Sequence, residues 1–380
     1  SRNIALLLPL SGRTAKQAQA IQDAILATHK LSSSGMNPIK TYDTANNIES
    51  IGNIYQRAVN DGADFIIGPL LKRNIRELAS SVKLTTPVLA LNRIEESVGF
   101  SQPVYQFGLN PGDEARQAAE RARLDGRQRI VALVPDSPWG ERVLAAFADS
   151  WQQAGGELMG VERYPARTTD FSQYIQRILN LDTSKQRRRS LERRLGQKLE
   201  FQARKRKDVD SVFIVAFPRE ARQITPQLRF HHANDLAVYA TSHIYSGAPD
   251  ATKDRDLNGI RFCDTPWTLG STGESALRQQ LERSWGKRAS HYQRLFALGI
   301  DAYQLIPWLE SSARSNQIGY TGTTGILTLD DNRLLHRRLD CAEFRKGLPD
   351  TLGTLPVTVT DNPQETIPST QPTLRWSTNR

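Results

Sequence analysis

The chain has 380 residues and a formal net charge of +10; 38% of its residues are hydrophobic and 24% are charged. This composition is typical of a soluble globular protein, and no apolar run approaches the roughly 20 residues that a membrane-spanning helix needs. The length favours two lobes over a single core. No signal peptide is visible and Ser1 lies close to a predicted strand, so we expect the chain to be the mature or trimmed part of a longer protein.

The first hundred residues alternate short apolar runs with segments of helical periodicity. The apolar runs predict strands at 3–8, 39–43, 64–68, 87–91 and 104–108. Helical periodicity falls at 14–30, 48–61 and 74–83. Strands that alternate with helices of this length indicate βαβ crossovers, and therefore a parallel sheet with helices on its faces.

The same alternation then restarts. Further strands are predicted at 129–134, 158–164, 211–216, 237–241, 259–263 and 325–329. Further helices are predicted at 113–123, 140–154, 171–179, 219–230, 275–285 and 294–310. The fold class that follows is α/β, with two lobes that each contain an open, mostly parallel sheet flanked by helices. From residue 354 onward, prolines among Thr, Ser, Asn and Gln predict an extended or disordered tail.

A basic block interrupts the second half of this pattern. Residues 185–207 include eleven Lys or Arg and two Glu, a net charge of +9, whereas the rest of the chain is nearly neutral. Leu191, Leu195 and Leu199 are four residues apart. This spacing predicts a helical insertion over 181–208 with one narrow apolar stripe.

The charge of this block suggests an acidic partner. Proteins that bind single-stranded nucleic acid interleave several aromatic residues with basic ones, whereas Phe201 is alone here, so we expect no nucleic-acid partner. A solvated helix and a docking surface for an acidic protein patch are the two interpretations that stay open. The candidate docking residues are Arg187, Arg188, Arg193 and Arg194.

Motifs of common catalytic and cofactor chemistry are missing from the sequence, which has no GxSxG, HExxH, P-loop or GxGxxG pattern. We therefore expect no enzymatic activity, no cofactor and no metal site. Polar residues gather instead after the predicted strands, at the edge where open parallel sheets bind ligands. The candidate ligand-binding residues are Ser11, Gly12, Pro69, Asn92, Asp136, Ser137, Trp139, Ser242 and Tyr245. Turns and helix caps use the same residue types, so structural roles explain this set equally well.

The chain has two cysteines, Cys263 and Cys341. They form one disulfide in an oxidising compartment, or they are two separate buried thiols; the sequence leaves both interpretations open.

Four stretches resemble the penicillin-binding protein activator family, the LppC/LpoA-type outer-membrane lipoproteins of Gram-negative bacteria. They are IALLLPLSGR at 4–13, LGQKLEFQARKRKDVDSVFIVA at 195–216, QLRFHHANDLAVYATSHIYSGAPDATKDRDLNGIRFCDTPW at 227–267 and TGILTLDDNRLLHRRLDCAEFRKGLP at 324–349. The resemblance covers about residues 3–349 and corresponds to the C-terminal domain of that family.

The resemblance implies a two-lobed fold of the type I periplasmic-binding-protein kind, in which the chain crosses between lobes three times. We expect crossings near Gly108, Thr241 and Arg333, so that residues 1–108 and 242–333 form one lobe and 109–241 and 334–353 the other. The implied function is a non-enzymatic periplasmic regulator that binds and activates a class A penicillin-binding protein, a peptidoglycan synthase. Full family members also have a lipid anchor in the outer membrane and a tetratricopeptide-type domain. We expect neither within these 380 residues, so membrane attachment is expected only through that anchor. The family provides no catalytic residues and no agreed ligand.

Two rival functions share this fold. A periplasmic solute-binding protein would close its lobes over a small polar molecule in the cleft. A ligand-sensing part of a transcription regulator would have the same architecture, but the sequence has no helix-turn-helix segment to support it.

Overall fold

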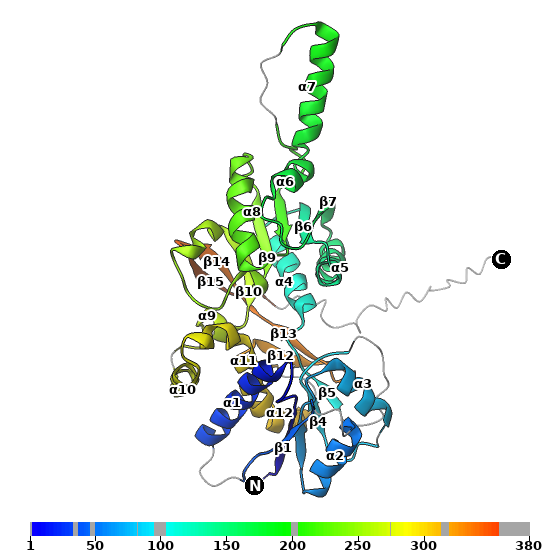
Figure 1. The fold of residues 1–380 in the computed structure, drawn as a ribbon, viewed down its shortest axis with the longest axis vertical. Helices are drawn as coiled ribbons and strands as arrows, with labels where there is room; N and C mark the ends of the chain where they lie inside the picture. Colours follow the sequence, from blue (N-terminus) through cyan, green and yellow to red (C-terminus); the bar gives the residue numbers. More distant parts are fainter. Residues whose placement is uncertain are drawn as a thin grey trace, which may run out of the picture.

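The computed structural model describes residues 2–32, 37–45, 50–81, 83–94, 104–198, 204–273, 275–312 and 319–356. Two lobes lie end to end along the long axis of the molecule, and helix α7 projects from the far end of the second lobe (Figure 1). The predicted α/β architecture with mostly parallel sheets flanked by helices is confirmed.

The first lobe is built on a parallel sheet in the order β2-β1-β3-β4-β5. Its strands are β1 (Ile4–Leu8), β2 (Lys40–Asp43), β3 (Phe65–Ile67), β4 (Val88–Ala90) and β5 (Val104–Gln106). Side chains alternate between the faces along β1: Leu6 and Leu8 pack toward α1 (Ala15–Ser32), whereas Ala5 and Leu7 pack toward α2 (Ile51–Asn60) and α3 (Lys72–Ser81). Both faces are therefore covered, which explains the continuous apolar sequence of this strand.

The second lobe contains a mixed sheet in the order β15-β14-β10-β9-β8-β6-β7. The parallel strands are β6 (Arg129–Pro135), β7 (Glu157–Tyr164), β8 (Ser211–Ile214), β9 (Ala237–Thr241) and β10 (Ile260–Asp264), and β14 (Asp340–Arg345) and β15 (Leu348–Thr354) are antiparallel. One face packs against α4 (Pro111–Leu124) and α5 (Pro138–Gln153), and the other against α6 (Ser172–Ile178) and α8 (Pro218–Phe230).

The segment between β9 and β10 adds η1 (Ser242–Ile244) and η2 (Lys253–Leu257) to the second lobe. The elements after β10 complete the first lobe and then lead back to the second. They are α9 (Pro266–Leu269), α10 (Ala276–Trp285), η3 (Gly286–Tyr292), α11 (Gln293–Gln304), α12 (Ile306–Ser312), β11 (Tyr320–Thr321), β12 (Ile326–Leu329) and β13 (Leu335–Arg338). Helix α11 packs on α1, and the small antiparallel sheet β11-β12-β13 contributes Leu327 and Leu335 to the first-lobe core.

Within the described residues, the chain passes between the lobes after β5, after β10 and after β13. The first passage, at 107–110, agrees with the crossing expected near Gly108. The other two expectations are wrong. Strand β10 pairs with β9 in the second sheet, so the second passage follows Asp264 rather than Thr241. Strand β13 still pairs with β12, so the third passage is at Leu339 rather than Arg333.

The basic block forms a shorter helix than predicted. Helix α7 (Leu181–Leu195) starts at the buried Leu181 and ends at Gly196, whose φ of 63° is the left-handed conformation that terminates helices. The prediction of a helix through residue 208 is therefore wrong, because 204–208 are not helical. Leu191 and Leu195 are 49% and 59% exposed, and Leu199 lies outside the described residues.

The end of the described chain is more ordered than the composition suggests. Thr354 belongs to β15, and Leu355 is 3% exposed in a small cluster with Leu339 and the two cysteines. The prediction of a tail is therefore wrong for residues 354 and 355, and residues 357–380 lie outside the described part. No helix among the described residues has the length and apolar character required to cross a membrane.

Candidate functional site at the interlobe hinge

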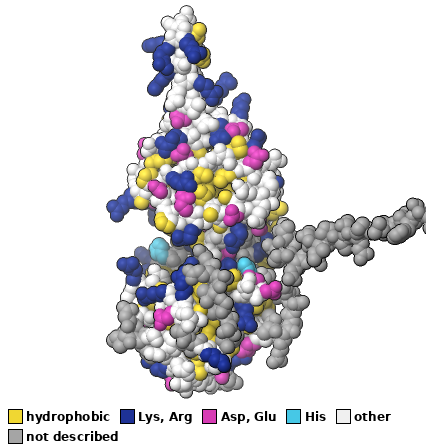
Figure 2. Space-filling view, turned by 90° about the vertical axis from the view of Figure 1, so that its right-hand side faces the viewer, with side chains coloured by type: hydrophobic (Ala, Val, Ile, Leu, Met, Phe, Trp, Pro, Cys, Tyr) yellow, Lys and Arg dark blue, Asp and Glu magenta, His cyan; other side chains and the backbone are white. Residues whose placement is uncertain are grey.

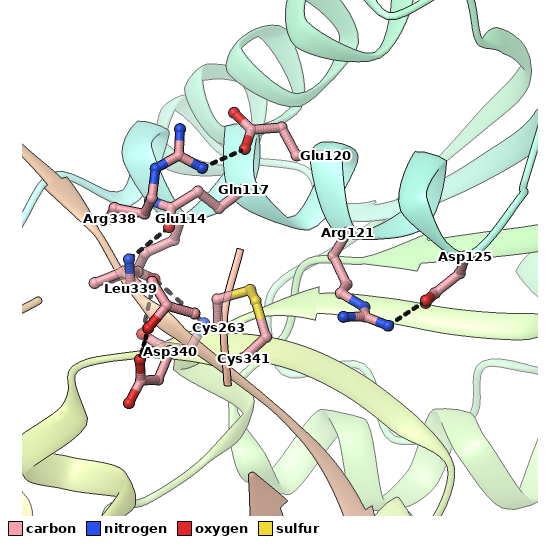
Figure 3. Close-up of a disulfide and its surroundings, with 12 residues drawn as sticks. Glu114, Gln117, Glu120, Arg121, Asp125, Cys263, Arg338, Leu339, Asp340 and Cys341 are labelled. Carbon is pink, nitrogen blue, oxygen red and sulfur yellow. Dashed lines mark hydrogen bonds and ion pairs between the residues drawn. A yellow bond between two sulfur atoms is a disulfide. The ribbon is translucent and has the colours of Figure 1, made fainter. Parts of the chain in front are cut away.

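Helix α4 carries polar side chains that contact the passages between the lobes. Asp113 and Gln117 are one turn apart on this helix and are buried. Asp113 forms an ion pair with Arg93, which follows β4 in the first lobe, at 3.1 Å. The Gln117 side chain accepts a hydrogen bond from the Leu339 amide at 2.6 Å (Figure 3). It also donates one to the Arg337 carbonyl at 2.8 Å. Helix α4 therefore contacts both the first lobe, through Arg93, and the third passage, through Leu339.

Glu114 is the buried acidic centre of this hinge. Its Oε2 accepts hydrogen bonds from the Ser242 amide and hydroxyl at 3.2 and 2.7 Å, and it lies 3.4 Å from His243 Nδ1. Burial by itself raises the pKa of this carboxyl, but His243, Arg337 and Arg294 outweigh burial and lower the pKa of Glu114 to about 2. Glu114 is thus ionised at neutral pH and poorly suited to act as a general base.

Arg294 on α11 reaches from the first lobe to the second. Its Nε and Nη2 donate to Asp264 at the end of β10, with the shortest distance 2.6 Å, and Nη2 also donates to the Ser242 and Tyr245 carbonyls at 2.9 and 3.0 Å. Burial opposes the charge of this guanidinium, but the carboxylates of Asp264 and Glu114 outweigh it and raise the pKa of Arg294. The second passage is therefore held by a charged, multiply hydrogen-bonded arginine.

Cys263 and Cys341 form a disulfide between β10 and β14 (Figure 3). The two residues are direct partners in the antiparallel register, next to Asp264 and two residues after Leu339. Both flank a passage between the lobes. The disulfide thus joins the strand that precedes the second passage to the strand that follows the third passage.

Two candidate ligand-binding residues belong to this hinge rather than to an open groove. Ser242 is 1% exposed, with its hydroxyl bound to Glu114. Tyr245 is 3% exposed, and its ring packs in the core against Phe262 and Phe344 at 5.9 and 5.8 Å. The expectation that these two side chains face a ligand is wrong, because the turn after β9 directs them inward.

Three aromatic side chains form a platform after three neighbouring strands. Trp139 follows β6, Phe217 follows β8 and His243 follows β9. The Trp139 and Phe217 rings stack with centroids 4.9 Å apart, and the His243 ring meets Trp139 edge-on at 5.0 Å. Of the neighbouring candidates, Asp136 is exposed and Ser137 caps α5 by accepting a hydrogen bond from the Gly140 amide.

The candidate ligand-binding residues of the first lobe lie at the carboxyl edge of its sheet, but they differ in exposure and in structural role. Ser11 and Gly12 are exposed. Pro69 is buried and follows a cis peptide bond. The Asn92 side chain donates to the Leu70 carbonyl at 3.1 Å and so joins two neighbouring loops. Pro69 and Asn92 thus have clear structural roles.

The candidate docking residues lie on the projecting helix. Arg187, Arg193 and Arg194 are exposed, whereas Arg188 is partly buried and 3.6 Å from Glu192. Lys and Arg side chains gather on this projection beside hydrophobic ones (Figure 2). The surface is basic with a small apolar part.

Comparison with known proteins identifies the family. A protein-family sequence model described as "LppC putative lipoprotein" matches residues 1–347. The chain belongs to the LppC family. Among its relatives is a protein of Photobacterium profundum named "Penicillin-binding protein activator LpoA", which is 31% identical over 349 residues. The match covers 90% of this LppC chain but 56% of that relative, so the chain spans about half the length of that relative.

Solved structures agree with this assignment. The LppC chain is similar to a Haemophilus influenzae structure described as the "LpoA (YraM) C-domain", "a regulator of PBP1A", with a TM-score of 0.71 and 26% identity over 92% of this chain and 99% of that domain. It is also similar to a putative branched-chain amino acid ABC transporter structure from Chromobacterium violaceum, with a TM-score of 0.68 and 27% identity, covering 90% of this chain and all of that one.

Proposed function

We propose that the chain binds and activates a class A penicillin-binding protein in the periplasm, as part of a lipoprotein attached to the outer membrane, and that it catalyses no reaction itself. The observation that carries this proposal is the similarity to the regulator domain of H. influenzae over 99% of that domain. Activation requires the chain to bind the active conformation of the synthase more tightly than the inactive one.

The hinge geometry supports a binding role over catalysis. Glu114 and Asp264 are both engaged by basic or hydrogen-bonding partners within the protein. Groups committed in this way stabilise one arrangement of the lobes and have little freedom to exchange protons with a substrate. A fixed arrangement suits a protein that presents its outer surface to a partner.

The direct test measures glycan polymerisation by a purified class A penicillin-binding protein with and without the chain. We expect the rate to rise in a saturable manner as chain is added, and the same preparation to turn over no peptidoglycan fragment on its own. An unchanged rate combined with no detectable complex would refute the proposal.

A second candidate function is binding of a small solute between the lobes. The platform of Trp139, Phe217 and His243 supports it, because aromatic rings at strand ends suit a ring-containing ligand, and the Phe217 side chain is 51% exposed. Calorimetry with amino acids, muropeptides and nucleotides tests this alternative. Heat that saturates with one of them, and that a Phe217→Ala variant lacks, is the expected signature.

A further inference from the structure

A groove of about 600 Å³ opens on the second lobe, at the edge of the sheet away from the hinge. Its walls come from the start of β9 and β10, the end of α8 and the loop that precedes β6. The hinge lies at the opposite, carboxyl ends of the same strands. The groove is therefore separate from the place where this fold binds solutes, and its size is within the usual range for organic ligands.

The groove has more positive charge than its own carboxylates neutralise. Arg261 is paired with both Asp125 and Glu343, at 2.6 and 2.9 Å. Arg127 and Arg229 also line the groove, and no carboxylate among the residues that the structure describes pairs with either. These two guanidiniums are available to a carboxylate from outside.

The immediate contacts of these two arginines are neutral. Arg229 is exposed and donates to the Asn258 carbonyl at 2.8 Å. Arg127 lies beside the hydroxyl of Tyr239, and its Nε is buried without an acceptor in the described part of the chain. A guanidinium group that has no carboxylate partner within the protein can bind one from outside, because its planar fork of N–H donors matches the two carboxylate oxygens.

The groove also has apolar lining residues and a basic neighbour. Leu228 and Leu236 form part of its lining, and Phe230, which follows Arg229 at the end of α8, is 78% exposed. The other acidic residue of the wall, Asp235, forms an ion pair with Lys205 from the basic block at 2.7 Å. Lys205 thus joins the basic block to the wall of the groove, and Leu228 and Leu236 give the groove an apolar floor.

We propose that this groove docks an acidic, extended segment of the class A penicillin-binding protein, with carboxylates on Arg127 and Arg229 and an apolar side chain against the floor. The inference rests on the proposed function. Charge complementarity of this kind accelerates association and sets orientation, and apolar contact in the centre supplies affinity.

The test measures binding of the intact chain to the synthase by interferometry, at low and at high salt. The variants are Arg229→Glu, which changes an exposed side chain only, and Arg127→Glu combined with Arg229→Glu. The matched control combines Arg73→Glu with Lys83→Glu, which reverses two exposed charges on the first lobe. Thermal melting checks that each variant is folded, and the single variant decides the matter if the double variant does not fold.

We expect the double variant to bind about tenfold or more weakly, with a smaller salt dependence, and the control to bind as the unchanged chain does. Equal binding by the double variant, or an equal loss in the control, would overturn the groove assignment. Absence of binding by the unchanged chain would instead overturn the proposed function, so the two failures are distinguishable.

Discussion

Arg294 on α11 and Asp264 at the end of β10 form a two-point ion pair across the hinge, with Nη2 2.6 Å from Oδ2 and Nε 2.9 Å from Oδ1. Asp264 is 1% exposed. The pair joins a helix of the first lobe to a strand of the second, so any rotation of the lobes must break it or carry it along.

Replacing Asp264 by Asn removes the carboxylate that Arg294 binds at two points and leaves Glu114 as its other acidic neighbour. We expect the free energy of unfolding to fall by about 3–5 kcal/mol, the usual cost of breaking a buried pair from one side. Urea denaturation measures this. Glu141→Gln, which removes an exposed partner of Arg163, is the control and should cost about 1 kcal/mol or less. Equal losses in the two variants would contradict a special role for the hinge pair.

The stability of the chain should depend on pH through Glu114. Its folded-state pKa is lowered from 4.5 to about 2, so its contribution is present above pH 4.5 and is lost as the pH falls toward 2. The difference corresponds to about 3 kcal/mol. Unfolding free energies measured between pH 7 and acid should fall less steeply in Glu114→Gln, whereas Glu157→Gln on an exposed strand end should keep the full slope. Parallel profiles for all three proteins would refute this assignment.

The disulfide should contribute to stability because it closes a long loop. Cys263 and Cys341 are 78 residues apart, and in the chain-entropy model a loop of this length stabilises the native state by up to about 4.5 kcal/mol. We expect the double Cys→Ser variant to unfold at lower urea concentration, by about 2–4 kcal/mol. Reducing agent should destabilise the unchanged chain to a similar extent and leave the variant unaffected. A reductant effect on the variant would point to a different cause.

The projecting helix should contribute to synthase binding without contributing to folding. Changing Arg187, Arg188, Arg193 and Arg194 to Glu reverses the charge of α7, and three of the four side chains are exposed. We expect weaker synthase binding, most visibly in the association rate, and an unchanged melting temperature. Unchanged affinity would remove α7 from the interface and leave the groove as the remaining basic contact.

The two lobes should keep one relative orientation in solution. Spin labels at Gln56→Cys and Ala145→Cys, on exposed positions of α2 and α5, report the distance between lobes. We expect a single narrow distance distribution that added amino acids or muropeptides do not shift, and a broader one when Arg294→Ala is introduced. A ligand-dependent shift in the unchanged chain would favour the solute-binding alternative.

Local sequence was sufficient for much of the fold. Buried runs such as 4–8 and amphipathic segments such as 15–32 form the strands and helices that their periodicity predicts. A helix that buries one face has apolar residues every three or four positions, and a central strand that buries both faces has a continuous apolar run. The strand-end rule also led to Trp139, which lies in the aromatic platform. Applied to β8, the same rule would have found Phe217.

Other features depend on contacts between distant segments. Spacing favoured extending α7 past residue 195, but Gly196 adopts a left-handed conformation that ends it. Ser242 and Tyr245 follow a strand as predicted, yet whether such a side chain faces a groove or the core depends on the turn that follows, which the contact with Arg294 holds in place. Nothing in the local pattern distinguishes Glu114 from an ordinary helical acid.

The sequence by itself determined the alternation of strands and helices, the two-lobed parallel architecture and the family resemblance, because these follow from short-range periodicity and from motifs. Only the tertiary structure decided where the chain passes between the lobes, that Cys263 and Cys341 pair, and that Glu114, Asp264 and Arg294 meet. The physical reason is register: these groups lie far apart in the chain, and which of them become neighbours depends on how β10, β14 and α11 pack together.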